Sequence, residues 1–205
     1  MKKIGIIGSG SVARTLGDGF LKHGYEVMLS SRDVSKLDDW KKKSGDKGST
    51  GSFSDAAKFG EIVVLAVLGR AAAEAIEEAG PQHLSGKTVI DTTNPIGESG
   101  PEDGVLQFTT GLDESLMEQL QERFPEIHLV KAFNSVGSPR MVNPDFKEGR
   151  PTMFICGNND NARSEVSDIL DMFGWEVEDM GKATAARAIE PLCMLWCIPG
   201  FRNNS

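Results

Sequence analysis

The stretch that decides the fold is Lys3–Ala13, KIGIIGSGSVA. It begins with an apolar run typical of a strand, and the residues after the glycines start a helical pattern over 11–23. The turn between them has the pattern G-x-G-x-x-A. There the first glycine permits a tight turn, the second lets backbone approach a pyrophosphate, and the small third residue lets helix pack on strand. Because the helix N-terminus also offers N–H groups and a positive dipole end, the sequence predicts a dinucleotide-binding turn.

Apolar runs and helical patterns continue to alternate along the chain. Further strands are predicted at 25–30, 61–67, 87–91, 127–132, 151–156 and 175–178, with a short one inside the loop 44–52. Further helices are predicted at 33–43, 71–79, 112–124, 160–173 and 183–198, and 96–111 reads as a long loop near the ligand. Continuous apolar strands separated by helices indicate a parallel sheet covered on both faces.

The predicted fold is therefore α/β, a Rossmann-type, doubly wound, mainly parallel sheet with a small C-terminal α/β lobe. We expect a dinucleotide-binding domain over 1–150, with 151–205 as the small lobe packed on it in a single compact unit.

The composition excludes several classes of protein. The 205 residues are 39% hydrophobic and 25% charged, as in a globular domain. The formal charge of −8 argues against nucleic acid or an anionic membrane as a partner. No stretch approaches the ~18 apolar residues of a membrane span, and the N-terminus reads as a strand rather than a signal peptide. The three cysteines, Cys156, Cys193 and Cys197, suit a reducing compartment, so we expect a cytoplasmic protein.

The end of the second strand predicts the type of dinucleotide. Folds specific for NAD carry an acidic residue there, which binds the ribose hydroxyls. This chain has Ser30, Ser31 and Arg32 instead, and Lys36 lies one helical turn further on. Hydroxyls and a guanidinium attract a 2′-phosphate, which a carboxylate would repel. Asp33 either weakens this pocket or caps the following helix. The sequence predicts NADP(H) in preference to NAD(H).

Several further motifs resemble one family. They are Gly8-Ser9-Gly10, Ser31-Arg32, Lys131-Ala132-Phe133-Asn134, Ile155-Cys156-Gly157-Asn158, and Ala186-Arg187 followed by Ile189-Glu190. Together they resemble the deazaflavin-dependent NADP reductases (NADPH:8-hydroxy-5-deazaflavin oxidoreductases). They are equally similar to the cytosolic NADPH domain of the six-transmembrane epithelial antigen of prostate metalloreductases.

The resemblance implies a small-molecule redox acceptor, a deazaflavin or flavin, whose ring lies against the nicotinamide and exchanges hydride with it directly. It also implies a homodimer. By position, Ser9, Ser31 and Arg32 match NADP-binding residues, and Arg187 would anchor the second cofactor.

Hydride transfer between stacked rings needs proximity and an apolar wall more than an acid or a base. Ligands of open α/β sheets bind at the carboxyl ends of the strands, where this chain offers further candidates. The predicted cofactor-binding residues are Gly8, Ser9, Gly10, Ser11, Val12, Ser30, Ser31, Arg32, Lys36, Ala66, Val67, Leu68, Asn94, Pro95 and Asn134.

No catalytic or metal-binding set is predicted. His23, His83 and His128 are scattered along the chain, and Cys193 and Cys197 are too few for a zinc site. We expect these cysteines and Trp196 in the core, and Asp91 as the cap of a turn.

Two other functions fit the same pattern. One is an NADPH-dependent reductase of small imines or carbonyls, although that class usually needs a long helical C-terminal domain and a well-placed Lys or His. The other is a non-catalytic NADPH-binding module, which would lack an apolar cavity for a second ligand.

Overall fold

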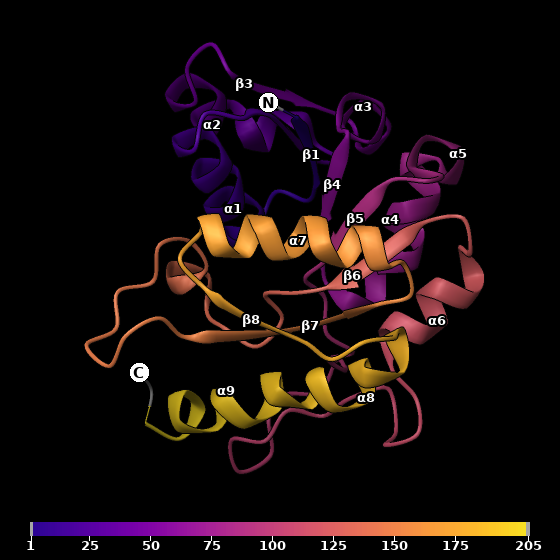
Figure 1. Ribbon diagram of the computed structural model, residues 1–205, viewed down its shortest axis with the longest axis vertical. Helices are drawn as coiled ribbons and strands as arrows, with labels where there is room; N and C mark the ends of the chain where they lie inside the picture. Colours follow the sequence, from indigo (N-terminus) through magenta and orange to yellow (C-terminus); the bar gives the residue numbers. More distant parts are fainter. Residues whose placement is uncertain (1, 204–205) are drawn as a thin grey trace.

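A single sheet runs through the computed structural model, which describes residues 2–203 (Figure 1). The strand order is β3-β2-β1-β4-β5-β6-β7-β8. The strands are β1 (Lys3–Ile7), β2 (Glu26–Ser30), β3 (Gly48–Gly51), β4 (Ile62–Leu65), β5 (Thr88–Asp91), β6 (His128–Lys131), β7 (Thr152–Gly157) and β8 (Glu176–Asp179). The first six are parallel in the order 3-2-1-4-5-6 of a doubly wound dinucleotide-binding fold. The predicted fold class is confirmed.

Helices cover both faces of this sheet. One face carries α1 (Ser11–Lys22), α2 (Asp38–Lys43) and α7 (Asp160–Met172), the orange helix that crosses the sheet in Figure 1. The other carries α3 (Phe53–Phe59), α4 (Ala72–Ala79), α5 (Pro81–Leu84), α6 (Leu116–Arg123) and α8 (Ala186–Ile189). Short 3-10 turns occur at Val34–Leu37, Gly69–Ala71, Ser138–Arg140 and Ala183–Ala185, and α9 (Pro191–Asn203) follows α8.

The alternation of side chains along β1 builds both halves of the core. Ile4 and Ile6 belong to the cluster under α1 and α7, whereas Ile7 belongs to the cluster on the other face. Gly5 allows α3 to pack directly on the strand, because a Cβ there would lie 2.1 Å from the carbonyl oxygen of Ala56.

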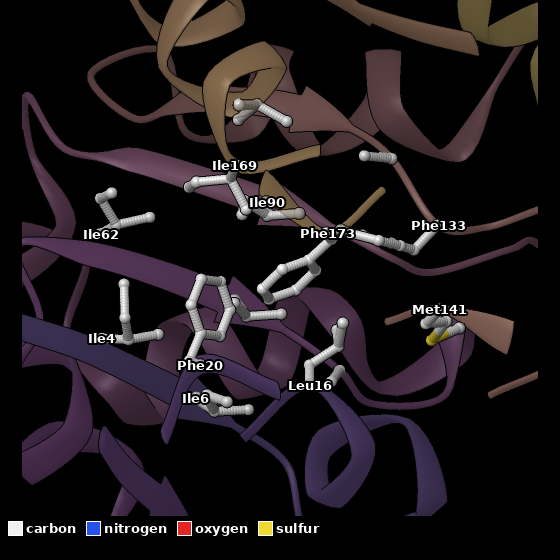
Figure 2. Close-up of a cluster of buried hydrophobic side chains, with 14 of the residues drawn as sticks. Ile4, Ile6, Leu16, Phe20, Ile62, Ile90, Phe133, Met141, Ile169 and Phe173 are labelled. Atoms are coloured by element: carbon white, nitrogen blue, oxygen red, sulfur yellow. The ribbon is translucent and has the colours of Figure 1, made fainter. Parts of the chain in front are cut away.

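The two ends of the chain share the first of these clusters. Phe20 of α1 and Phe173, which follows α7, meet with ring centroids 4.9 Å apart (Figure 2). Contacts of this kind bury the early and late parts of the sequence together. Residues 152–179 also continue the sheet itself, since β7 pairs with β6 and β8 pairs with β7.

Some element boundaries differ from the prediction. The helix expected over 112–124 begins at Leu116, because Ser115 caps it by accepting the Glu118 N–H. The closing helix expected over 183–198 is divided into a 3-10 turn, α8 and α9. The helix α3 was missed, although Ser52 and Asp55 form a capping box at its start. The contact between β6 and β7 is antiparallel.

The helix α9 is only partly covered by the rest of the chain. Cys193 is its buried residue, while Leu195 and Trp196 are 66% and 45% exposed. The expectation that Trp196 and both cysteines lie in the core is therefore wrong for Trp196, and Cys197 is only half-buried. These residues are exposed because α9 continues past α8 and lies over the loops at Gly104 and Gly137, not on the sheet. No helix within residues 2–203 has both the length and the apolar character needed to cross a membrane.

Candidate functional site

A cleft of about 420 Å³ opens at the carboxyl ends of β1, β2 and β4. Between β1 and β4 the strand order reverses, which is where open α/β sheets bind their ligands. The predicted site residues that line it are Gly8, Ser9, Gly10, Ser11, Val12, Ser31, Arg32, Lys36, Ala66, Val67 and Leu68. Sequence patterns from three separate strand ends thus meet in one cleft.

The glycine turn forms the floor of this cleft. Gly8 has a φ of 141°, and a Cβ there would lie 2.2 Å from the carbonyl oxygen of Ala66. A Cβ at Gly10 would meet no atom within 4 Å, so it would project into open space. The helix α1 begins at Ser11 without the side-chain cap that Ser52 gives α3. Its free N–H groups, together with the open space over Gly10, fit a pyrophosphate.

The end of β2 supplies the polar wall. Arg32 extends into solvent, with its guanidinium Nη1 3.9 Å from Oε2 of Glu74. The Ser31 hydroxyl accepts the Asp33 N–H at 3.2 Å. Asp33 accepts the N–H and the hydroxyl of Ser35 at 3.2 and 2.6 Å, so it caps the 3-10 turn Val34–Leu37, which is one of the two roles that the sequence left open. The Ser35 hydroxyl also lowers the pKa of Asp33, which keeps a negative charge in the cleft wall.

Two charged residues that line the cleft and one that supports its turns were missed from the sequence. Glu74 and Glu78 lie one turn apart on α4 and both line the cleft. Arg14, which is half-buried, donates from Nε to the Ser9 carbonyl at 3.0 Å and from Nη2 to the Lys36 carbonyl at 2.6 Å. It joins the glycine turn to the 3-10 turn after β2. Its place on the first turn of α1 was the available signal.

A smaller pocket of about 190 Å³ continues the cleft. Val67, Leu68 and Thr92 line both, and Asn94 lines only the smaller one. Leu68 is 63% exposed, which is high for a leucine beside a pocket. The two pockets make one groove, and Leu68 lies where they meet. The charged side chains that line its larger part are Arg32, Lys36, Asp33, Glu74 and Glu78.

Three other predicted site residues lie behind this groove. The Ser30 hydroxyl is buried and donates to the Ile6 carbonyl at 2.7 Å. Pro95 is buried, and its carbonyl accepts the Thr109 N–H at 2.8 Å. Asn134 donates from Nδ2 to Oδ1 of Asn94 and to the Ile189 carbonyl, each at 3.1 Å. Asn134 thus does not line the groove itself but binds Asn94, which does.

Three buried charges lie beneath the smaller pocket. Lys131 Nζ is 2.7 Å from Asp91 Oδ2 and 2.8 Å from Glu190 Oε1, and all three side chains are at most 2% exposed. Burial alone would lower the pKa of Lys131, but the two carboxylates outweigh burial and raise it. Asp91 also accepts the N–H and hydroxyl of Thr93 at 2.9 and 2.7 Å, which confirms the expected turn cap. We call Asp91, Lys131 and Glu190 the charge cluster.

Arg187, which the family resemblance places at a second cofactor, binds a carboxylate of the chain itself. Its Nε and Nη2 donate to Glu118 at 2.8–3.1 Å, which links α8 to α6. This contact lowers the pKa of Glu118.

The histidines and cysteines form no reactive set. His23 ends α1 and packs on Phe173, and His128 begins β6. Burial raises the pKa of the Cys156 and Cys193 thiols to about 12, which makes both poor nucleophiles. Across residues 2–203, no three His, Cys, Asp or Glu side chains gather as a metal ion would require.

This fold and groove define a Rossmann-type protein with a dinucleotide site at the switch point of its sheet. Residues 3–95 match the model of the coenzyme F420-dependent NADP oxidoreductases. A crystal structure from Arthrobacter sp. FB24, assigned as an F420-dependent NADP reductase, superposes with a TM-score of 0.92 at 30% identity, covering 100% of this chain and 96% of that one. The chain belongs to the F420-dependent NADP oxidoreductase family, as the sequence motifs predicted.

Metalloreductases are also similar to this chain. Metalloreductase STEAP3 of Rattus norvegicus is 29% identical over 204 residues, which is 96% of this chain and 38% of that protein. Metalloreductase STEAP2 of Homo sapiens is 28% identical over 191 residues, 92% of this chain and 35% of that one. The chain thus spans a little over a third of these relatives.

Proposed function

We propose that this chain transfers hydride between NADPH and a deazaflavin or flavin-type acceptor. The observation that carries the proposal is the continuous groove. It runs from Arg32, over the open floor at Gly10, to the smaller pocket at Asn94. The Arg32 guanidinium, the open space over Gly10 and the Leu68 side chain follow one another in the order of the 2′-phosphate, the pyrophosphate and the nicotinamide of NADPH.

Each part of the groove has a distinct role in this proposal. The turn Gly8–Val12 holds the pyrophosphate, and Ser31, Arg32 and Lys36 hold the 2′-phosphate. Val67, Leu68 and Asn94 surround the nicotinamide, and bound NADPH supplies the hydride. The protein contributes position and exclusion of water, which are the main requirements of transfer between two rings. The exposed Leu68 side chain offers an apolar surface for a planar acceptor.

The test has two stages. The first is a calorimetric or fluorescence titration of the protein with NADPH and with NADH, in which we expect NADPH to bind more tightly. The second follows NADPH oxidation with a deazaflavin, with flavins and with cyclic imines. Oxidation by the imine alone would favour a reductase of small imines. Tight NADPH binding without turnover by any acceptor would indicate a binding module. The homodimer implied by the family belongs to the same proposal, and light scattering tests it.

Adding one methyl group to the cleft floor should weaken binding and leave the fold intact. In Gly10→Ala the new Cβ meets no protein atom within 4 Å, so we expect the free energy of unfolding to change by less than about 1 kcal/mol. The same methyl would occupy the place of the pyrophosphate, and overpacking of this kind costs about 1–3 kcal/mol. NADPH affinity should fall about 5–150-fold, as measured by titration.

Gly8→Ala provides the contrast. Its Cβ would lie 2.2 Å from the Ala66 carbonyl oxygen at a φ of 141°, so this variant should lose stability as well as affinity, as followed by urea denaturation. Unchanged NADPH affinity in Gly10→Ala would place the pyrophosphate elsewhere.

Removing a carboxylate near Arg32 should strengthen NADPH binding. Glu74 Oε2 lies 3.9 Å from the Arg32 guanidinium and competes with a 2′-phosphate for it. Surface pairs of this type contribute about 0.2–1 kcal/mol, so Glu74→Gln should raise NADPH affinity up to about fivefold. NADH affinity should change less. Weaker NADPH binding would mean that Glu74 orients Arg32 instead of competing for it.

A further inference from the structure

We propose that the charge cluster positions the nicotinamide half of the site, acting through the loop 92–97. The inference rests on the proposed function, because it assigns the smaller pocket to the nicotinamide. Asp91, Lys131 and Glu190 touch no part of the groove directly. They hold the backbone from which Thr92 and Asn94 reach it.

Strand register brings the first two charges together. Asp91 and Lys131 are paired positions of β5 and β6, each the last residue of its strand. The loop starts at the next residue, Thr92. Lys131 Nζ donates to the Thr93 carbonyl at 2.8 Å, while Asp91 Oδ1 accepts the N–H and hydroxyl of the same residue. Every polar group of Thr93 is therefore bound to the cluster.

The third charge comes from a distant part of the chain. Glu190 follows α8, and its Oε1 faces Lys131 at 2.8 Å. The same carboxylate accepts the N–H groups of Leu116 and Met117 at 2.9 and 3.0 Å, at the start of α6. The cluster thus joins β5, β6, α6 and the end of α8 at one point beneath the loop.

A strained residue supports the loop independently. Phe133, two residues after Lys131, has a φ of 62° although it is bulky and buried. Such a conformation persists only where the surrounding structure enforces it, and it often occurs at functional sites. The next residue, Asn134, binds Asn94 in both directions. Asn134 Nδ2 donates to Asn94 Oδ1 at 3.1 Å, and Asn94 Nδ2 donates to the Asn134 carbonyl at 2.8 Å.

A role in positioning the loop 92–97 explains why the charge cluster is buried. A buried ion pair seldom stabilises a fold more than apolar residues of similar volume, but it can enforce one geometry. Hydride transfer depends steeply on geometry, and a displacement of about 1 Å is costly. The adenosine half is built separately, because Ser31 and Arg32 follow β2 on the other side of β1. Changes in the cluster should therefore affect one half of the dinucleotide.

The experiment compares two ligands on isosteric variants. Asp91→Asn places an amide N–H donor opposite the Lys131 ammonium. Glu190→Gln places an amide N–H donor opposite the backbone N–H groups at the start of α6. Each is titrated with NADPH and with adenosine 2′,5′-bisphosphate, which lacks the nicotinamide half. Glu118→Gln is the matched control, because it weakens an ion pair between α6 and α8 that lies outside the cluster.

We expect Asp91→Asn and Glu190→Gln to bind NADPH about tenfold more weakly, as when one buried polar contact is lost. Their affinity for adenosine 2′,5′-bisphosphate should change less than about twofold, and the control should keep both affinities. If the cluster had a purely structural role, the variants would bind both ligands more weakly by the same factor. That result, or unchanged affinity for both ligands, would overturn the inference. Failure of the unmodified protein to bind NADPH would instead reject the proposed function.

Discussion

Replacing Lys131 by methionine should lower the free energy of unfolding by about 3–5 kcal/mol, the cost of breaking a buried ion pair from one side. Lys131 is fully buried and is the shared partner of Asp91 and Glu190. Without the ammonium, two carboxylates stay close together in a dry interior, and the Thr93 carbonyl loses its donor. Urea denaturation of Lys131→Met against the unmodified protein measures the loss.

A triple variant separates the charge effect from the loss of packing. Adding Asp91→Asn and Glu190→Gln to Lys131→Met removes the uncompensated charges while keeping the side-chain volumes. We expect it to be more stable than Lys131→Met alone. The pKa of Lys131 is raised above its ordinary value of 10.5. Its contribution is therefore fully present below about pH 10 and is lost only as pH rises through the folded-state pKa. A loss below about 1 kcal/mol at neutral pH would show that water reaches the cluster.

Removal of the Arg32 guanidinium should abolish the preference for NADPH over NADH. A charge-assisted contact to a phosphate is worth about 1.5–3 kcal/mol, so Arg32→Ala should lose about 10–150-fold in NADPH affinity. NADH lacks the 2′-phosphate, and its affinity should stay nearly constant. Parallel titrations of the two nucleotides measure the change in their ratio.

Arg123→Ala is a suitable control for this effect. Arg123 is also an exposed arginine, but it pairs with Glu77 away from the groove. Its removal changes the net charge by the same amount and should leave the nucleotide preference unaltered. If Arg32→Ala weakens NADPH and NADH equally, Arg32 binds a part that both nucleotides share, and the 2′-phosphate lies elsewhere.

Most of the fold could be predicted from local sequence patterns. The apolar runs at 3–7 and 61–67 became the central strands β1 and β4, and the glycine turn between β1 and α1 lies where its pattern predicts. Such signals are readable because strand burial and turn chemistry depend on neighbouring residues. Two helices were exceptions. The helix α3 was missed, and α9 has an apolar composition that suggested burial although the helix extends beyond the sheet.

The charge cluster could not be predicted in the same way. Asp91 and Lys131 become neighbours only through the register of β5 and β6, and Glu190 reaches them only after α8 has packed against α6. A polar residue at the end of an apolar strand was the one local sign. Ser30 shows the same limit, because its hydroxyl faces β1 while that of Ser31 lines the cleft.

Glu190 lies far along the sequence from the groups that it binds, Lys131 and the start of α6, which has a consequence for synthesis of the chain. When a ribosome has released the chain only as far as Ile189, Lys131 has one carboxylate partner and the first N–H groups of α6 have no acceptor. On such a chain the point where β5, β6 and α6 meet is incomplete. The loop 92–97 therefore lacks its third charge until residues beyond Ile189 have emerged, and ribosomes stalled shortly before Glu190 should hold a chain that proteases still cut within residues 92–116.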